Sequence, residues 1–151
     1  MQKHLIALSL GTLALGIAEF CMMSILSNVA ADLNVSIPQA GHFVSAYASG
    51  VCIGALLMVI FARNLGLKSL LLLIVGFIFL GNGLTVFAFD YWSMLCGRLI
   101  AGLPHGAYFG VGAIVATQLA KKGEASKDVC LMVAGMTVAN LIGVPLGSFL
   151  S

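Results

Sequence analysis

Five long apolar stretches run through the sequence, and they limit what the chain can fold into. Each has about 20 residues or more, which is the length that a helix needs to cross the hydrocarbon core of a bilayer. A helix also satisfies its own backbone hydrogen bonds, as a segment in lipid must. The stretches cover residues 5–30, 40–62, 68–89, 92–119 and 129–151. We therefore predict an all-α fold, a polytopic transmembrane helix bundle in which five membrane-spanning helices form a single membrane domain over residues 1–151.

The composition supports a membrane protein and excludes several other classes. Only 8% of the residues are charged, whereas about a quarter of the residues of a soluble domain are charged. The net charge of +2 is too small to indicate a nucleic-acid-binding surface. The sequence contains no phosphate-binding loop, zinc-protease motif or nucleophile elbow, and its four cysteines fall singly in separate apolar stretches. We expect no enzyme activity, no metal or other cofactor, and no nucleic-acid partner.

Basic residues set the expected orientation in the cell (inner) membrane. Six of the seven lie before the first helix, at the two ends of the second loop or in the fourth loop, while the first and third loops contain none. The positive-inside rule places these basic segments, and with them the amino terminus, in the cytoplasm. The six residues are Lys3, Arg63, Lys68, Lys121, Lys122 and Lys127. Because the sequence ends inside an apolar stretch, we expect it to be part of a longer protein.

Small residues recur at every fourth position on three of the predicted helices. Such ridges let two helix backbones approach closely, which is a main source of helix association in lipid. They fit packing inside the bundle, and they also fit a sliding contact between two moving halves of a larger protein. The ridges are Ala46, Gly50 and Gly54; Gly102, Gly106 and Gly110; and Gly135, Ala139, Gly143 and Gly147.

Two loops carry signals for the start of a helix. Ser36 and Gln39 have the spacing of a capping box ahead of the second helix. Asp90 can cap the fourth helix with its side-chain oxygen. We expect the side chains of Ser36 and Asp90 to accept hydrogen bonds from free backbone N–H groups in the first turn of their helices.

Two charged residues, Glu19 and Arg98, are expected far from either membrane surface. Glu19 lies about 14 residues along the first helix, or about 21 Å from the inner face, and Arg98 lies about 6 residues into the fourth helix, or about 9 Å from the outer face. In a core about 30 Å thick, these depths are the same. A hydrogen-bonded pair would reduce the cost of burying either charge alone. The alternatives are that Arg98 extends to the nearer interface and that Glu19 is protonated within the bundle.

Other polar residues accompany this pair. His105 follows Arg98 by seven residues, close to two helical turns, so both lie on one face of the fourth helix. Tyr108 or Phe109 continues that stripe, and Pro104 can bend the helix there. Asn140 is a further candidate on the fifth helix. A structural role for His105 is as plausible as a functional one. Three polar residues, His42, Ser45 and Tyr47, lie near the outer end of the second helix. Ordinary interhelical hydrogen bonding explains most such groups without a ligand.

Several motifs resemble those of one membrane-protein family. The segment RLIAGLPHG (98–106) has the RxxxGxxxG arrangement of the fourth helix of the major facilitator superfamily, and GMTVANLIGVPLG (135–147) resembles the antiporter motif of its fifth helix. Similarity to the drug:proton antiporter type, in its arabinose efflux permease-like branch, extends to GIAEF (16–20), DLNVSIPQAGHFVSAYASG (32–50) and PHGAYFGVGAI (104–114).

This resemblance implies twelve helices in two halves, with alternating access around a central cavity. The chain would supply the amino-terminal five helices, and the carboxy-terminal half would be missing. The first and fourth helices would line the cavity, where Glu19, Arg98 and His105 fall, with Tyr108 and Asn140 as further candidates. The second and fifth helices would meet the opposite half, which the glycine ridges fit. The motif positions implied to serve conformational change are Gly50, Gly54, Arg63, Gly66, Lys68, Gly102, Gly106, Gly135, Gly143, Pro145 and Gly147.

The sequence departs from the family pattern at two places. In the second cytoplasmic loop, Ala62 stands where the family has an aspartate before the arginine. In the fifth-helix motif, Val144 stands where proline is expected, Pro145 is shifted by one position, and Ser148 replaces a glycine. The resemblance implies that this loop relays charge and locks the inward gate of the family's transporters. The departures put that role in doubt, together with the position of the kink in the fifth helix.

The resemblance and the buried charges together predict a secondary active transporter. Its partners would be a small-molecule solute, either sugar or drug-like, and protons entering from outside, with the lipid bilayer around it. Burial and the arginine act in opposite directions on the protonation of Glu19, so this carboxyl group could exchange a proton during the cycle. The alternative is a truncated, non-transporting membrane fragment or a subunit that only packs against other helices.

Overall fold

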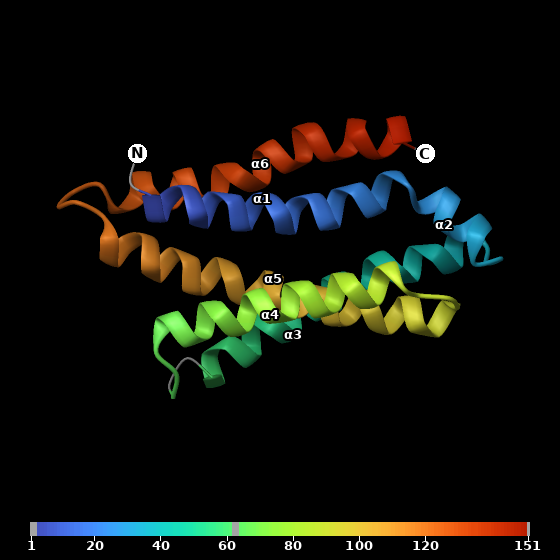
Figure 1. The fold of residues 1–151 in the computed structure, drawn as a ribbon, viewed down its shortest axis with the longest axis horizontal. Helices are drawn as coiled ribbons and strands as arrows, with labels where there is room; N and C mark the ends of the chain where they lie inside the picture. Colours follow the sequence, from blue (N-terminus) through green and yellow to red (C-terminus); the bar gives the residue numbers. More distant parts are fainter. Residues whose placement is uncertain (1–2, 62–63, 151) are drawn as a thin grey trace.

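The computed structural model describes residues 3–61 and 64–150, and Figure 1 shows its fold. All regular structure in these two ranges is helical. The helices are α1 (Lys3–Ser24), α2 (Leu26–Asp32), α3 (Ile37–Phe61), α4 (Leu67–Val86), α5 (Tyr91–Leu119) and α6 (Ala125–Leu150). All except α2 are long and apolar enough to cross a membrane. The prediction of an all-α bundle with five membrane-spanning helices is confirmed.

The first apolar stretch differs from the single helix expected over residues 5–30. It folds as α1 and the short α2, with a break at Ile25, whose backbone (φ −99°, ψ 12°) leaves the α-helical region. The Ser24 hydroxyl donates to the carbonyl oxygens of Cys21 at 2.8 Å and Phe20 at 3.3 Å. A serine that bonds back to the preceding turn in this way favours a bend.

The helices form two groups that lie side by side along the long axis of the molecule (Figure 1). One group is α1 with α6, which run in the same direction, and the other is α3, α4 and α5. The helix α5 packs against α3 and α4 and also contacts α6 and α1, so it joins the two groups. It is the most buried of the five spans. Polar side chains on α5 are therefore held inside the bundle.

The contact between α1 and α6 combines small residues with hydroxyl groups. The Thr12 hydroxyl donates to the Met132 carbonyl at 2.6 Å, and the Ser9 hydroxyl donates to the Leu131 carbonyl at 2.8 Å. Gly135 lies against the Ser9 carbonyl oxygen, so the two backbones approach closely there. Near the other end of α6, Gly147 lies against the Ser24 hydroxyl, and the nearest atom to a methyl group at Gly143 would be Phe20 Cβ at 3.7 Å.

The glycine ridges of α3 and α5 face each other. A methyl group at Gly50 or Gly54 would collide with the backbone of α5, at Leu99 or Leu103. In return, Gly102 lies against the Tyr47 carbonyl oxygen and Gly106 against that of Val51. The ridges thus pack within this chain, as the ridge of α6 does against α1. The expectation that the ridges of α3 and α6 mark the surface for an opposite half is not supported, because atoms of the same chain already lie against them. On α5, Gly110 is exposed.

The remaining family-motif positions make looser contacts. Gly66 precedes α4 as its N-cap, with nothing near the position of a Cβ atom, and Lys68 is exposed in the first turn. Pro145 is exposed on α6, which continues through it. Arg63, together with the neighbouring Ala62, lies outside the described residues.

Ser36 and Asp90 cap the starts of α3 and α5, as the sequence predicts. The backbone N–H groups of Ser36 and Gln39 each bond the other residue's side chain, at 2.9 and 3.4 Å, ahead of α3. Asp90 accepts from the Ser93 N–H at 2.8 Å, while the Ser93 hydroxyl accepts from the Asp90 N–H at 3.1 Å. These bonds with Ser93 hold the pKa of the Asp90 carboxyl group below its ordinary value of 3.8.

We expect Asp90→Ala to lower the midpoint of thermal unfolding in detergent by about 3 °C at neutral pH, because the first turn of α5 loses its cap. The pKa of Asp90 is lowered on folding, so its ionised form is the stabilising one. This contribution is present above pH 3.8 and is lost as the pH falls through the lower, folded value. Asp90→Asn is the control: it keeps a capping oxygen and should lose only the acid sensitivity. Equal midpoints for Asp90→Ala and the unmodified chain would contradict the prediction.

Candidate functional site

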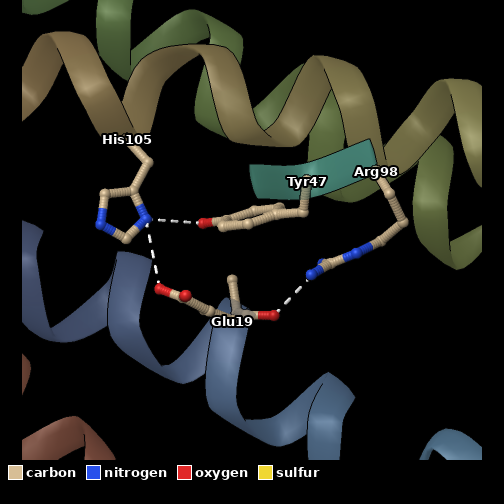
Figure 2. Close-up of polar contacts among 5 residues, drawn as sticks. Glu19, Tyr47, Arg98 and His105 are labelled. Carbon is tan, nitrogen blue, oxygen red and sulfur yellow. Dashed lines mark hydrogen bonds and ion pairs between the residues drawn. The ribbon is translucent and has the colours of Figure 1, made fainter. Parts of the chain in front are cut away.

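Three helices bring four polar side chains together near the middle of the molecule. Glu19 comes from α1, Tyr47 from α3, and Arg98 and His105 from α5 (Figure 2). We call these four residues the polar cluster. Arg98, Tyr47 and His105 are buried, with exposed fractions of 2%, 2% and 6%. The structure therefore brings together the three residues that the sequence placed in a cavity and adds a tyrosine.

The guanidinium of Arg98 points into the bundle. Its Nη1 donates to the Ala18 carbonyl oxygen at 3.3 Å, and its Cζ lies 4.3 Å from the centroid of the Tyr47 ring (Figure 2). A cation over an aromatic face is stabilised more strongly when water is excluded. Its Nε is buried and has no hydrogen-bond acceptor within the described residues. Extension of Arg98 to the membrane interface, one of the alternatives above, does not occur.

The ring of His105 contacts both a tyrosine and a carboxylate. Its Nδ1 lies 2.8 Å from the Tyr47 hydroxyl and 3.6 Å from Glu19 Oε2 (Figure 2). The first distance is a hydrogen bond; the second is an ion-pair distance when the ring is protonated. On its other side, the ring stacks on Phe109 with 5.3 Å between centroids. These contacts hold the imidazole toward α1.

Glu19 is paired differently from the expectation. Within residues 3–61 and 64–150, no ion pair of 4.0 Å or less joins Glu19 to Arg98; His105 is the nearer partner. The reason is rotation about the axis of α1. Successive residues are turned by about 100°, so α1 presents the Ala18 carbonyl to the guanidinium and Glu19 to the imidazole. The Glu19 side chain is 29% exposed, so it borders the surface of the bundle beside two buried partners.

Tyr47 was given only an ordinary hydrogen-bonding role by the sequence, yet it is the centre of the cluster. The signal that could have identified it is its spacing from the glycine ridge. Tyr47, Gly50 and Gly54 are related by three and four residues and so share one face of α3. Since that face packs on α5, it also carries the tyrosine to Arg98 and His105.

Two other predicted site residues lie outside the polar cluster. Tyr108 is buried, but its hydroxyl donates to the Leu8 carbonyl oxygen at 3.0 Å and its ring packs over Gly11, so it joins α5 to the first half of α1. Asn140 is exposed on α6. No hydrogen bond connects either residue with the cluster in the part of the chain that the structure describes.

The chemistry available at the cluster is proton exchange and ion pairing. No group of three or more His, Cys, Asp or Glu residues that could hold a metal ion occurs among the described residues. An apolar cavity of about 90 Å³ between α3, α4 and α5 borders Pro104 but none of the four residues. The class of protein follows from this site. It is a polytopic membrane protein in which membrane-spanning helices carry a carboxylate, an imidazole and a guanidinium inside the bundle.

Comparison with known proteins identifies the family. The chain matches the Major Facilitator Superfamily over residues 8–151. It is 46% identical over its full length to "Putative transporter AraJ" of Escherichia coli (strain K12), and 38% identical over 97% of its length to "Inner membrane transport protein YdhP" of the same strain. It is 31% identical over 99% of its length to a "Chloramphenicol resistance protein" of Streptomyces lividans. The chain belongs to the Major Facilitator Superfamily.

The match covers only part of these relatives. The chain spans 38% of the length of each of the three. The activity of a whole protein, and its solutes and partners, are therefore proposals for this chain.

Proposed function

We propose that the chain forms the amino-terminal helices of a secondary active transporter that moves a small solute out of the cell in exchange for protons. The observation that carries this proposal is the polar cluster. A carboxylate that is 29% exposed lies 3.6 Å from a buried histidine and beside a buried arginine, within membrane-spanning helices. Ionisable groups inside a membrane are costly to bury and mark proton or substrate pathways in transport proteins.

We infer a sugar or a drug-like compound as the solute class. Support for a drug-like solute comes from the Streptomyces relative, whose name records chloramphenicol resistance. Support for a sugar comes from the arabinose efflux permease-like motifs, such as GIAEF (16–20). The carboxy-terminal half of the transporter would supply the second wall of the cavity.

We also propose an inner-membrane location with the amino terminus in the cytoplasm. One relative is named as an inner membrane transport protein. One end of the molecule holds the start of α1, the end of α3, the start of α4 and the α5–α6 connection (Figure 1). Lys3, Lys68 and the lysines of the 121–127 segment belong to that end, as the positive-inside rule requires of a cytoplasmic face.

A liposome experiment separates this proposal from its alternative, a fragment or subunit that packs against helices and does not transport. Residues 1–151 alone and a full-length transporter carrying them at its amino end are reconstituted with an imposed pH gradient. Uptake of a labelled pentose, a labelled disaccharide and chloramphenicol is then measured. We expect gradient-driven flux only from the longer protein, because the isolated chain provides one wall of the pathway. Absence of gradient-driven flux from both would favour the alternative, and flux from residues 1–151 alone would contradict the need for a second half.

A further inference from the structure

Tyr47 contacts both of the basic residues that flank Glu19. Its ring centroid lies 4.3 Å from Arg98 Cζ, and its hydroxyl lies 2.8 Å from His105 Nδ1 (Figure 2). At 2% exposure, it is shielded from lipid and water. Its backbone is fixed as well, because the Tyr47 carbonyl oxygen lies against Gly102 on α5. One rigid side chain thus sets the position of both basic groups.

The Tyr47 hydroxyl and the Glu19 carboxylate face the same nitrogen atom. A neutral imidazole carries its proton on one ring nitrogen only. When His105 Nδ1 is unprotonated and accepts a hydrogen bond from the Tyr47 hydroxyl, it has no proton to offer Glu19 at 3.6 Å. When Nδ1 carries a proton, it can donate to the carboxylate instead. The titratable groups that face Tyr47 are Glu19 from α1 and Arg98 and His105 from α5.

We propose that Tyr47 is a positioning residue for proton exchange at Glu19: the ring holds Arg98, and the hydroxyl competes with the carboxylate for His105 Nδ1. This inference rests on the proposed transport function. Occupation of Nδ1 by the hydroxyl releases Glu19 from His105. The Nε–H group of Arg98, which has no acceptor among the described residues, can then donate a hydrogen bond to the Glu19 carboxylate. A proton from the aqueous phase that neutralises Glu19 ends either pairing.

Two substitutions separate the roles of the ring and the hydroxyl in the full-length transporter. Tyr47→Phe removes the hydrogen bond and keeps the ring under Arg98, so we expect initial gradient-driven flux to fall about fivefold. Its flux should also reach half-maximum at a different pH. Tyr47→Leu removes both contacts, and flux should fall about 50-fold. A merely structural role would lower the amount of folded protein without moving the pH profile of the folded fraction.

Tyr91→Phe is the matched control. The Tyr91 hydroxyl on α5 lies 2.7 Å from His42 Nδ1 on α3. This is also a tyrosine–histidine hydrogen bond between α3 and α5, but it lies at an exposed site. We expect flux and pH profile to be unchanged. Wild-type flux and pH profile in Tyr47→Phe would overturn the role of the hydroxyl.

A second measurement keeps this inference separate from the transport proposal. Nitrogen-15 NMR of the labelled protein in micelles reports the His105 Nδ1 resonance, assigned by its disappearance in His105→Gln. Tyr47→Phe should move that resonance, and Tyr91→Phe should not. If wild-type protein shows no gradient-driven flux, the transport proposal fails, whereas an Nδ1 resonance unmoved by Tyr47→Phe overturns the contact itself.

Discussion

Replacing Glu19 by glutamine is expected to reduce gradient-driven flux by about 100-fold or more, because the proposed proton carrier can no longer ionise. Glutamine preserves the size of the side chain and can still contact His105. Exchange of labelled solute for unlabelled solute, without a pH gradient, needs no net proton movement and should persist in Glu19→Gln. Both rates are measured in the same proteoliposomes, so retained exchange also demonstrates a folded protein.

Glu124→Gln provides the matched control. The Glu124 carboxylate also pairs with a basic side chain, lying 3.5 Å from Lys127 Nζ, but it is 42% exposed in the connection between α5 and α6. A surface ion pair of this kind contributes little to stability or function. Flux should therefore be normal in Glu124→Gln. Undiminished, gradient-dependent flux in Glu19→Gln would eliminate the proposed role of Glu19.

The depth of Glu19 and Arg98 could be predicted from the sequence, but their pairing could not. Counting residues from the ends of apolar stretches gives the level of a side chain in the membrane, and both residues do lie at the level where α1 and α5 meet. Depth does not fix the rotation of a helix about its own axis. A rotation of about one residue gave Arg98 the carbonyl oxygen of Ala18 and gave Glu19 the imidazole of His105.

Tyr108 shows the same limit of prediction from sequence, here within a single helix. It lies three residues after His105, and the sequence placed both on one functional stripe. However, α5 has neighbours on several sides, so each position along it meets a different partner. His105 faces Tyr47 and Glu19, whereas Tyr108 bonds Leu8 nearer the amino terminus of α1. Periodicity predicts which residues share a face, and tertiary packing decides what each of them contacts.

Substitution of Gly102 is expected to have the second large effect. Gly102 lies on α5 between Arg98 and His105, and its Cα is 3.1 Å from the place where a Cβ atom at Gly50 would stand. In Gly102→Ala, the new methyl group would meet the Tyr47 carbonyl oxygen, with the Val51 nitrogen at 3.0 Å. Backbone atoms in a helix cannot move aside as a flexible side chain can, so α3 and α5 must separate. We expect a loss of about 2–3 kcal/mol, seen as a thermal midpoint lower by about 8 °C in detergent.

Gly76→Ala makes the same chemical change where nothing lies within 4 Å of the new methyl group, on α4. It should leave stability unchanged or raise it by up to about 1 kcal/mol, since alanine favours helix more than glycine does. Separation of α3 from α5 would also draw Tyr47 away from Arg98 and His105, so Gly102→Ala should impair gradient-driven flux even in the fraction that remains folded. A Gly102→Ala protein as stable as Gly76→Ala would show that the two ridges do not hold α3 against α5.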